Sequence, residues 1–398
     1  MKPSRVIIVG GGVTGMSAAY HLARRNFGRI TLLEKGTLGE GSSSRSAGII
    51  TELLWSETGV RARQRSLELF RELSQVLKGY KFQPVGCLNL FDPSSWPEAQ
   101  QLLPLYRKLD APFEILSHHE IRRRWPALHP TEELVGIYDP LGGYSEPDEY
   151  IPALANENRR LGVELYEKEK VTEFLVRNGS IAGVKTAERT IEGDAVICVV
   201  FAWCNKLMEN LGLRLPVKTF VHQRFVTGPL PVPVQIPAVN ANPLGGYFRP
   251  ALGQRLLAGV ETPEREEYRI TSTDFSMVTL SASPDVRRRL LKDLIPLIPA
   301  LRNASWETEK IGLITFSIDG EPILGPVAKL PGLYVGTAFH SGGFAYNPVA
   351  GLLLAEFITE GRTSIDASAF SPDRFEPHAV EEYLSTTIAQ KNAFDRRH

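Results

Sequence analysis

The amino-acid sequence predicts an α/β fold, because strand and helix patterns alternate at its N-terminal end. Residues 6–9 (VIIV) are β-branched and followed by glycine, as in a buried parallel strand. Apolar residues between Met16 and Ala23 then recur with the period of a helix. A second strand pattern (ITLL) occupies residues 30–33. A strand, a helix and a second strand in this order form the opening unit of a parallel sheet.

The turn after the first strand reads GGGVTG at residues 10–15 and fits the pattern G-x-G-x-x-G. In this pattern Gly10 permits a tight turn, Gly12 lets the backbone approach a pyrophosphate, and Gly15 lets helix and strand pack closely. The N-terminus of the helix offers free N–H groups to phosphate. Glu34 ends the second strand and can accept hydrogen bonds from both ribose hydroxyls of an adenosine. An ordinary glycine-rich turn does not explain Glu34, so the unit predicts a dinucleotide site.

A loop of small and hydroxyl residues follows at residues 38–48 (LGEGSSSRSAG). Such residues cap helices and offer N–H and O–H donors to a second phosphate group. Taken alone, the loop is equally compatible with a flexible surface segment. Arg45 within it, and the apolar Ile49 and Ile50 after it, favour a binding site.

Composition excludes several other classes of protein. The 398 residues include 45 basic and 45 acidic side chains, so the formal net charge is +0 and gives no bulk attraction to nucleic acid or anionic membranes. No apolar run approaches the roughly 18 residues of a membrane span, and no secretory signal opens the chain, so a cytoplasmic protein is expected. Cys87, Cys198 and Cys204 lack C-x-x-C spacing, which argues against disulfides and against a structural metal site.

Three further segments, together with the N-terminal unit, resemble the D-amino-acid oxidase-like superfamily of FAD-dependent oxidoreductases. They lie at residues 41–50, 143–186 and 319–344, and the resemblance covers most of residues 5–375 in the order of the family. The glycine oxidase, sarcosine oxidase β-subunit and dimethylglycine dehydrogenase branches are the most similar. The resemblance therefore implies an FAD cofactor.

The resemblance also implies an α/β plus α+β fold, in which a Rossmann-type FAD-binding domain is interleaved with a substrate domain built on a mostly antiparallel sheet. The FAD-binding domain would comprise residues 1–80, 143–215 and 315–370, the substrate domain residues 81–142 and 216–314, and a C-terminal helical extension residues 371–398. The residues expected to contact FAD are Gly10, Gly12, Val13, Thr14, Gly15, Glu34, Lys35, Ser42, Ser43, Arg45, Ser46, Ala47, Gly48, Ile49, Val171, Gly342, Gly343 and Phe344.

The chain departs from these relatives where they tether flavin and bind a substrate carboxylate. Arg45 stands where the dimethylglycine dehydrogenase branch has a flavin-bearing His, and no cysteine follows Cys204, so FAD is expected to be noncovalent. Thr51 and Ala345 occupy the places of the cationic anchors of monomeric sarcosine oxidases. Residues 312–315 read GLIT where glycine oxidases carry an anchoring Arg.

Four residues are candidates for the catalytic side of the site. Arg249 is the candidate anchor for a substrate carboxylate, with a surface or phosphate-side arginine as the alternative. His340 is the candidate titratable group beside the flavin, although a structural histidine would fit equally well. Tyr247 and Tyr346 could orient the substrate, although aromatic residues are more often core. A further departure from the related enzymes is Phe201, which stands where they carry a glycine that lets the backbone approach the dinucleotide. Either the local backbone path shifts or the Phe201 ring covers the adenosine.

Together these features predict an FAD-dependent amine or amino-acid dehydrogenase or oxidase, in which a hydride passes to flavin N5 and water hydrolyses the imine. Oxidases of the superfamily often keep a lysine over the flavin, and residues 256–259 (LLAG) offer none, which favours a dehydrogenase with an unidentified electron acceptor. Two alternatives stay open: an FAD-dependent 2-hydroxyacid dehydrogenase, and a flavin-containing subunit or assembly protein that needs a partner. A homo-oligomer or a hetero-oligomeric flavin subunit is compatible with these readings.

Overall fold

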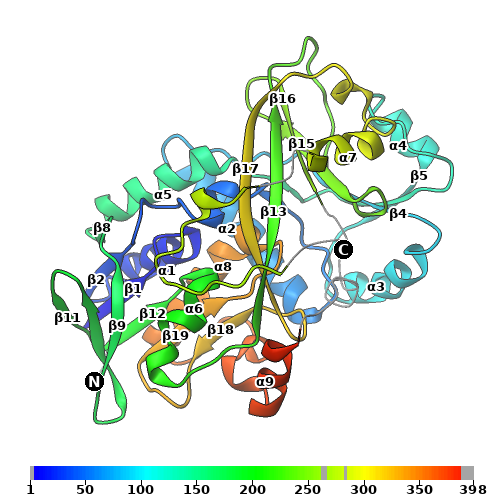
Figure 1. Ribbon diagram of the computed structural model, residues 1–398. Helices are drawn as coiled ribbons and strands as arrows, with labels where there is room; N and C mark the ends of the chain where they lie inside the picture. Colours follow the sequence, from blue (N-terminus) through cyan, green and yellow to red (C-terminus); the bar gives the residue numbers. More distant parts are fainter. Residues whose placement is uncertain (1–3, 261–266, 282–284, 387–398) are drawn as a thin grey trace.

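The computed structural model describes residues 4–260, 267–281 and 285–386. Its strands form two large sheets, which occupy the lower left and the upper right of Figure 1, and two small ones. The long strands β13 (Val217–Thr227) and β17 (Trp306–Ser317) run side by side through the middle of the view. The mixed α/β fold with parallel and antiparallel sheets is therefore confirmed.

The first large sheet has six strands, and all but β18 run parallel to their neighbours. In spatial order its strands are β18 (Ile323–Pro326), β19 (Leu333–Thr337), β12 (Ala195–Cys198), β1 (Arg5–Val9), β2 (Arg29–Leu33) and β8 (Glu164–Tyr166). Ile7 and Ile8 of β1 point to opposite faces and are both fully buried, as expected for a central parallel strand covered on both sides.

The second large sheet has eight strands, and every neighbouring pair except β14 and β4 is antiparallel. Between β17 and β13 at one edge and β5 (Glu114–Ser117) at the other lie β16 (Arg255–Val260), β15 (Gly246–Ala251), β14 (Ala238–Ala241), β4 (Cys87–Phe91) and β6 (Val135–Asp139). The small sheets pair β3 (Ile49–Ile50) with β7 (Gly143–Tyr144), and join β9 (Val171–Arg177), β10 (Ser180–Thr186) and β11 (Thr190–Glu192).

The strands of the parallel sheet come from three separated stretches of chain, and those of the antiparallel sheet from the two stretches between them. The division of the chain into two interleaved domains with the stated boundaries stays a prediction. The expected C-terminal extension contains α9 (Pro377–Ser385), while residues 387–398 lie outside the described residues.

Helices cover both sheets. They are α1 (Val13–Arg24), α2 (Glu57–Val76), α3 (Trp96–Lys108), α4 (His118–Arg124), α5 (Pro147–Arg160), α6 (Cys204–Leu207), α7 (Asp285–Leu294) and α8 (Gly343–Glu360), besides α9. Ser56 caps α2 by accepting the N–H of Gly59, and Ser117 and Glu120 form a reciprocal capping box on α4. Within the described part of the chain, no helix combines the length and the apolarity that a membrane crossing requires.

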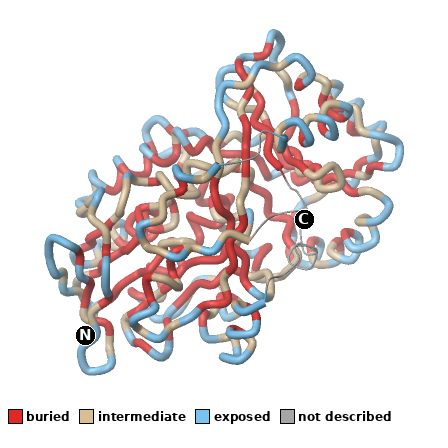
Figure 2. Tube along the Cα trace, in the orientation of Figure 1, coloured by how far each residue is buried: buried red, intermediate tan, exposed pale blue. Residues whose placement is uncertain are grey.

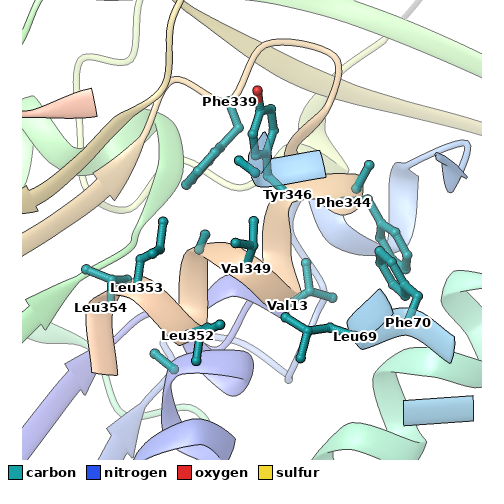
Figure 3. Close-up of a cluster of buried hydrophobic side chains, with 14 of the residues drawn as sticks. Val13, Leu69, Phe70, Phe339, Phe344, Tyr346, Val349, Leu352, Leu353 and Leu354 are labelled. Carbon is teal, nitrogen blue, oxygen red and sulfur yellow. The ribbon is translucent and has the colours of Figure 1, made fainter. Parts of the chain in front are cut away.

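The main core lies where α8 packs against α1 and α2. Helix α8 is apolar and buried almost all the way round, which suits a helix enclosed by other elements. Its close approach to α1 depends on Gly351, where an added Cβ would lie 2.4 Å from the Oγ of Ser17. Buried residues are concentrated along these central elements, and Figure 3 shows side chains of α8 meeting Val13 and Leu69 (Figure 2, Figure 3). This core holds the first turns of α1 and α8 in fixed positions.

Candidate functional site

A long cavity lies between the two large sheets. On one side it is lined by Val9, Glu34 and Val199, which stand at or just beyond the carboxyl ends of the parallel strands β1, β2 and β12. On the other side Asn240 and Tyr247 project from the antiparallel sheet. The carboxyl edge of a parallel sheet is the usual place for a ligand in such folds. All the residues predicted to contact FAD line this cavity except Gly15.

Gly10 and Gly15 have the backbone geometry that the motif predicts. Gly10 has a φ of +114°, and an added Cβ there would lie 2.6 Å from the backbone oxygen of Val199. A Cβ on Gly15 would lie 2.0 Å from the backbone oxygen of Gly10, so Gly15 sets the distance between strand and helix without lining the cavity. Gly12 is the N-cap of α1 and leaves the first turn without a side-chain cap.

The Glu34 carboxylate is held in place by backbone donors. Its Oε2 accepts the N–H of Gly11 at 2.7 Å, and its Oε1 accepts the N–H of Gly36 at 2.8 Å. Desolvation nevertheless raises the pKa of Glu34 above its ordinary value, because the group is largely enclosed. A carboxylate fixed in this way presents its remaining lone pairs to the cavity, as a ribose contact requires.

Lys35 lines the same end of the cavity, but its hydrogen bonds go to protein. Its Nζ donates to the backbone oxygens of Thr273 and Phe275 at 3.1 and 2.7 Å, and lies 3.9 Å from the centre of the Trp203 ring. Burial lowers the pKa of Lys35 to about 8. Lys35 therefore ties the segment around Thr273 to the second strand of the dinucleotide unit.

Phe201 has a backbone conformation that favours glycine. Its φ is +55°, a left-handed value that is costly for a residue with a bulky side chain. Its backbone oxygen accepts the hydroxyl of Thr337 at 2.9 Å, and its side chain packs beside Trp203 and Met277 while lining the cavity. The backbone at Phe201 is thus strained, and Phe201 stands in the wall of the cavity.

The serine-rich loop contains a short 3₁₀ turn, Ser42–Arg45, that is anchored on both sides. Ser43 Oγ accepts the N–H of Val13 at 3.1 Å, which joins the loop to the first turn of α1. Arg45 donates through Nε to the backbone oxygen of Ile311 at 2.7 Å and through Nη1 to that of Gly41 at 3.0 Å. These bonds make the loop an ordered wall of the cavity, in place of a flexible surface segment.

At the far end, Tyr247 and His222 form a pair on the antiparallel sheet. The hydroxyl of Tyr247 lies 2.6 Å from Nε2 of His222, and the two rings are stacked with their centres 5.6 Å apart. Both line the cavity. The Tyr247 ring crosses Gly259 so closely that an added Cβ would lie 2.0 Å from it. Neighbouring Asn240 also lines the cavity and donates to Oδ1 of Asn89 at 2.7 Å.

His340 lines the cavity in a setting that keeps it neutral. Its ring packs edge-on against Phe316 with centres 4.7 Å apart, and Nε2 lies 3.3 Å from the hydroxyl of Ser317. Desolvation lowers the pKa of His340 to about 3, so the imidazole does not carry a proton near neutral pH. This geometry favours the structural alternative over a titrating acid or base.

The structure corrects the expectation for Arg249. Its guanidinium is fully buried and pairs with both oxygens of Glu146, at 2.8 and 2.9 Å. It also donates to the backbone oxygens of Ala47 and Pro250 and lies over the ring of Tyr144. Because these contacts use its donors and Arg249 does not line the cavity, it cannot bind a substrate carboxylate there; it holds the serine-rich loop in place.

Tyr346 is also placed differently from the expectation. It lies on the first turns of α8 in the hydrophobic cluster, beside Phe339, and does not line the cavity (Figure 3). The guanidinium of Arg63 stands 4.4 Å from the centre of its ring. Tyr346 thus contributes to the site through the wall behind Arg63 and not by touching a substrate.

Comparison with known proteins identifies the family. Residues 5–357 match the family model described as DAO, FAD dependent oxidoreductase. The chain belongs to this family. The glycine oxidase of Geobacillus kaustophilus (strain HTA426) is 30% identical over 381 residues, which cover 93% of this chain and 96% of that protein. Sarcosine oxidase subunit beta of an Arthrobacter species is 26% identical and covers 98% of this chain and 95% of that protein.

The solved structure of L-proline dehydrogenase from P. horikoshii superposes on this DAO-family chain with a TM-score of 0.85. The two are 26% identical, and the match covers 94% of this chain and 98% of that one. Several other relatives are longer, and the chain covers only 42% to 47% of their length. The resemblance to the superfamily is therefore confirmed, and the chain is an FAD-dependent oxidoreductase.

The residues of the cavity fit the FAD of the family. Gly12 has no side chain to cap the first turn of α1, and Ser43 takes the N–H of Val13, so the remaining N–H groups of this turn provide the cradle that a pyrophosphate requires. Glu34 stands at the end of β2, where an adenosine ribose would lie. At the other end Gly342 caps α8 without a side-chain hydrogen bond, and Gly342, Gly343 and Phe344 at the start of this helix line the cavity.

Sequence reasoning missed Arg63, which lies on α2 and lines the cavity of this DAO-family chain. Only 3% of Arg63 is exposed, and its Nε and Nη1 make no hydrogen bond with any described residue. One signal was available in the sequence. Arg63 stands three residues after Val60 and four before Leu67, both buried, so it falls on the apolar stripe of an amphipathic helix.

Proposed function

We propose that this chain oxidises the carbon–nitrogen bond of an amine or an amino acid, with N-alkyl amino acids included. A hydride leaves the carbon that bears the nitrogen, and water hydrolyses the imine that results. The observation that supports this most directly is one cavity that joins a dinucleotide cradle to polar side chains on the antiparallel sheet. Relatives named glycine oxidase and L-proline dehydrogenase, by their names, act on amino acids.

When bound, FAD supplies the hydride acceptor at its N5. The chain binds it through the glycines of residues 10–15, through Glu34 and through the serine-rich loop. We propose that this binding is noncovalent, since Arg45, at the tethering position of one branch, instead bonds to backbone oxygens within the wall. If so, acid precipitation of the holoprotein releases all of the FAD into the supernatant, and flavin fluorescence measures it.

At the substrate end, the chain orients the nitrogen and keeps water away. The hydroxyl of Tyr247, fixed by His222, is the group we assign to a hydrogen bond with the substrate nitrogen. Ile314 and Phe339 contribute apolar wall, and an apolar surrounding favours the neutral amine, the form that can give up a hydride. The N–H groups at the start of α8 can stabilise negative charge that develops on the flavin ring.

An anaerobic bleaching screen tests the proposal. Holoprotein is mixed without oxygen with amines, amino acids, N-methyl amino acids and 2-hydroxy acids, and loss of the oxidised flavin absorption is followed. Reduction by one of the nitrogen compounds supports the proposal. Reduction by 2-hydroxy acids alone would replace it with the 2-hydroxyacid dehydrogenase.

A second candidate is a flavin-containing subunit whose activity depends on a partner chain. It is favoured by the likeness to sarcosine oxidase subunit beta, since the match spans nearly the whole of that subunit. Under this candidate the isolated chain binds FAD, yet none of the compounds in the screen bleaches it. Restoration of bleaching by a co-purifying protein would establish it.

We further propose that the chain is a dehydrogenase. Leu256 and Leu257 are buried, and Gly259 lies beneath the Tyr247 ring, so no ammonium group enters the cavity from this strand. Lys35 and Lys170 do line the cavity, but both belong to its dinucleotide end. Reduced holoprotein is expected to react slowly with dissolved oxygen and quickly with an artificial dye. Stopped-flow reoxidation as fast with oxygen as with the dye would assign an oxidase.

A further inference from the structure

We propose that Arg63 binds the carboxylate of the substrate. This inference rests on the proposed function and narrows its substrate class from amines in general to amino carboxylates. Arg63 is placed for the role because it is 3% exposed, lies on α2 and lines the cavity. Its Nη2 lies beside Gly342, where an added Cβ would be 2.3 Å away, so the guanidinium stands at the start of α8.

The guanidinium has no anionic partner in the described residues. Its Nε and Nη1 are buried without a hydrogen bond, and no carboxylate there forms an ion pair with it. The titratable groups that face Arg63 are Tyr346 and Cys87, and burial raises the pKa of both, so neither supplies a negative charge. A buried cation without a counter-charge is costly, which indicates that the partner is a ligand.

Two other arginines are as deeply buried, and both are satisfied by protein. Arg249 pairs with both oxygens of Glu146. Arg224 donates to the backbone oxygens of Ser44 and Arg45 at 2.9 and 3.1 Å. The open donors of Arg63 are therefore not a general property of buried arginines in this chain.

The nearby carboxylate of Asp139 is already committed. It accepts a hydrogen bond from the hydroxyl of Thr51 at 2.8 Å. It also accepts three backbone N–H groups, those of Leu141 at 2.8 Å, Gly142 at 2.9 Å and Glu52 at 3.0 Å. Arg63 therefore lines the cavity without an anion among the described residues, and its planar fork of donors matches a carboxylate.

Ligand binding to the holoprotein tests the assignment without turnover. The probe is 2-furoate, a redox-inert carboxylate, and its neutral partner is 2-furamide. Dissociation constants come from the change in flavin absorption and from the shift in melting temperature. Arg63→Met is expected to weaken 2-furoate about 100-fold, as loss of a charge-assisted pair does, and to leave 2-furamide within about threefold.

Two further variants make the result specific. Arg63→Lys keeps the charge but loses the fork, so it is expected to retain part of the preference for 2-furoate, and it serves alone if Arg63→Met does not fold. Arg61→Met is the matched control, because Arg61 is exposed on the same helix and pairs with Glu57. It is expected to bind both probes as the wild type does.

Several outcomes would overturn the assignment. They are wild-type holoprotein that binds 2-furamide as tightly as 2-furoate, an Arg63→Met variant that binds 2-furoate normally, and equal weakening of both probes. Loss of FAD from both Arg63 variants would likewise assign Arg63 to the cofactor. None of these results touches the proposed function, which fails separately if no amine or amino acid bleaches the wild-type flavin.

Discussion

The two ends of the cavity are built by different means. At the dinucleotide end, Gly10, Gly12 and Glu34 all belong to one strand–helix–strand unit, and the backbone provides much of the binding surface. At the substrate end, Arg63 comes from α2, while His222 and Tyr247 come from strands of the antiparallel sheet. The first end therefore depends on local backbone geometry, and the second depends on the packing of segments far apart in the chain.

Arg249 and Arg63 differ in whether the protein neutralises their positive charge. Arg249 is neutralised by Glu146 and serves the wall, whereas Arg63 has no anion in the described residues and faces the cavity. Burial alone does not separate the two, because both are almost completely enclosed. Whether the charge of a buried arginine is matched by protein decides whether it is structural or open to a ligand.

The largest effect is expected from Gly15→Ala. The added Cβ would lie 2.0 Å from the Gly10 backbone oxygen, so the strand and helix of the dinucleotide unit must separate. We expect a loss of more than about 4 kcal/mol in stability together with loss of FAD, measured by denaturation and by the ratio of flavin to protein. Gly41→Ala is the control, because Gly41 lines the same cavity and an added Cβ there meets no atom within 4 Å. Equal FAD content in the two variants would show that backbone packing does not govern this end.

Arg249→Met is expected to destabilise the protein by about 3–5 kcal/mol, because it leaves the buried Glu146 without its partner. Chemical denaturation measures the loss. Replacing both residues, by Glu146→Leu with Arg249→Met, is expected to recover most of it, since no buried charge then remains unpaired. A raised KM for carboxylate substrates with unchanged stability would instead restore Arg249 to the substrate site.

The dinucleotide end could be predicted from the sequence because its signals are local. The expected strands at residues 6–9 and 30–33 are found as β1 (Arg5–Val9) and β2 (Arg29–Leu33), with α1 between them. Gly15 meets the backbone of Gly10 within this unit, so the spacing of these two glycines carries their geometry. Gly10 also meets the backbone of Val199, which follows the adjacent strand β12, and the spacing within the motif does not predict that contact. The antiparallel sheet was expected through the family resemblance, because its strands pair residues that lie far apart in the sequence. Val217 of β13, for example, lies opposite Ser317 of β17.

The substrate end could not be predicted in the same way. The resemblance directed attention to Thr51 and Ala345, where related enzymes carry cations, and the cation of this chain comes from a different helix. Ser66 of α2 donates to the backbone oxygen of Ala345, which brings α2 and Arg63 to the start of α8. No spacing within α2 reveals that contact. Arg249 failed as a prediction because nothing in the sequence pairs it with Glu146, more than a hundred residues away.

His340→Asn tests the neutral character of the substrate end. The pKa of His340 is lowered to about 3, so between about pH 6.5 and 3 the unfolded chain binds a proton that the folded chain does not. The free energy of unfolding of the wild type therefore falls as the pH falls through this window. Between pH 7 and pH 4.5, His340→Asn is expected to lose about 2 kcal/mol less of this free energy than the wild type does. Denaturation at pH 7 and 4.5 measures the difference. The shape of the kcat/KM profile between pH 5 and 8 is expected to stay the same; a missing limb in the variant would make His340 a titrating catalytic group.

The smallest effect concerns Phe201, where backbone strain enters the dinucleotide end. Phe201→Ala and Phe201→Gly both remove the ring, so comparing them isolates the cost of a φ of +55°. Alanine is usually the more stable of the two, but here glycine is expected to be more stable by about 1 kcal/mol, because a Cβ is strained in the left-handed region. Ala202→Gly is the control, since Ala202 has no positive φ, and it is expected to destabilise by about 0.5–1 kcal/mol. Thermal unfolding of the four proteins decides the matter. If the glycine variant were less stable than the alanine variant, the backbone at position 201 would carry no strain. This part of the cradle would then depend on side-chain packing, as the substrate end does.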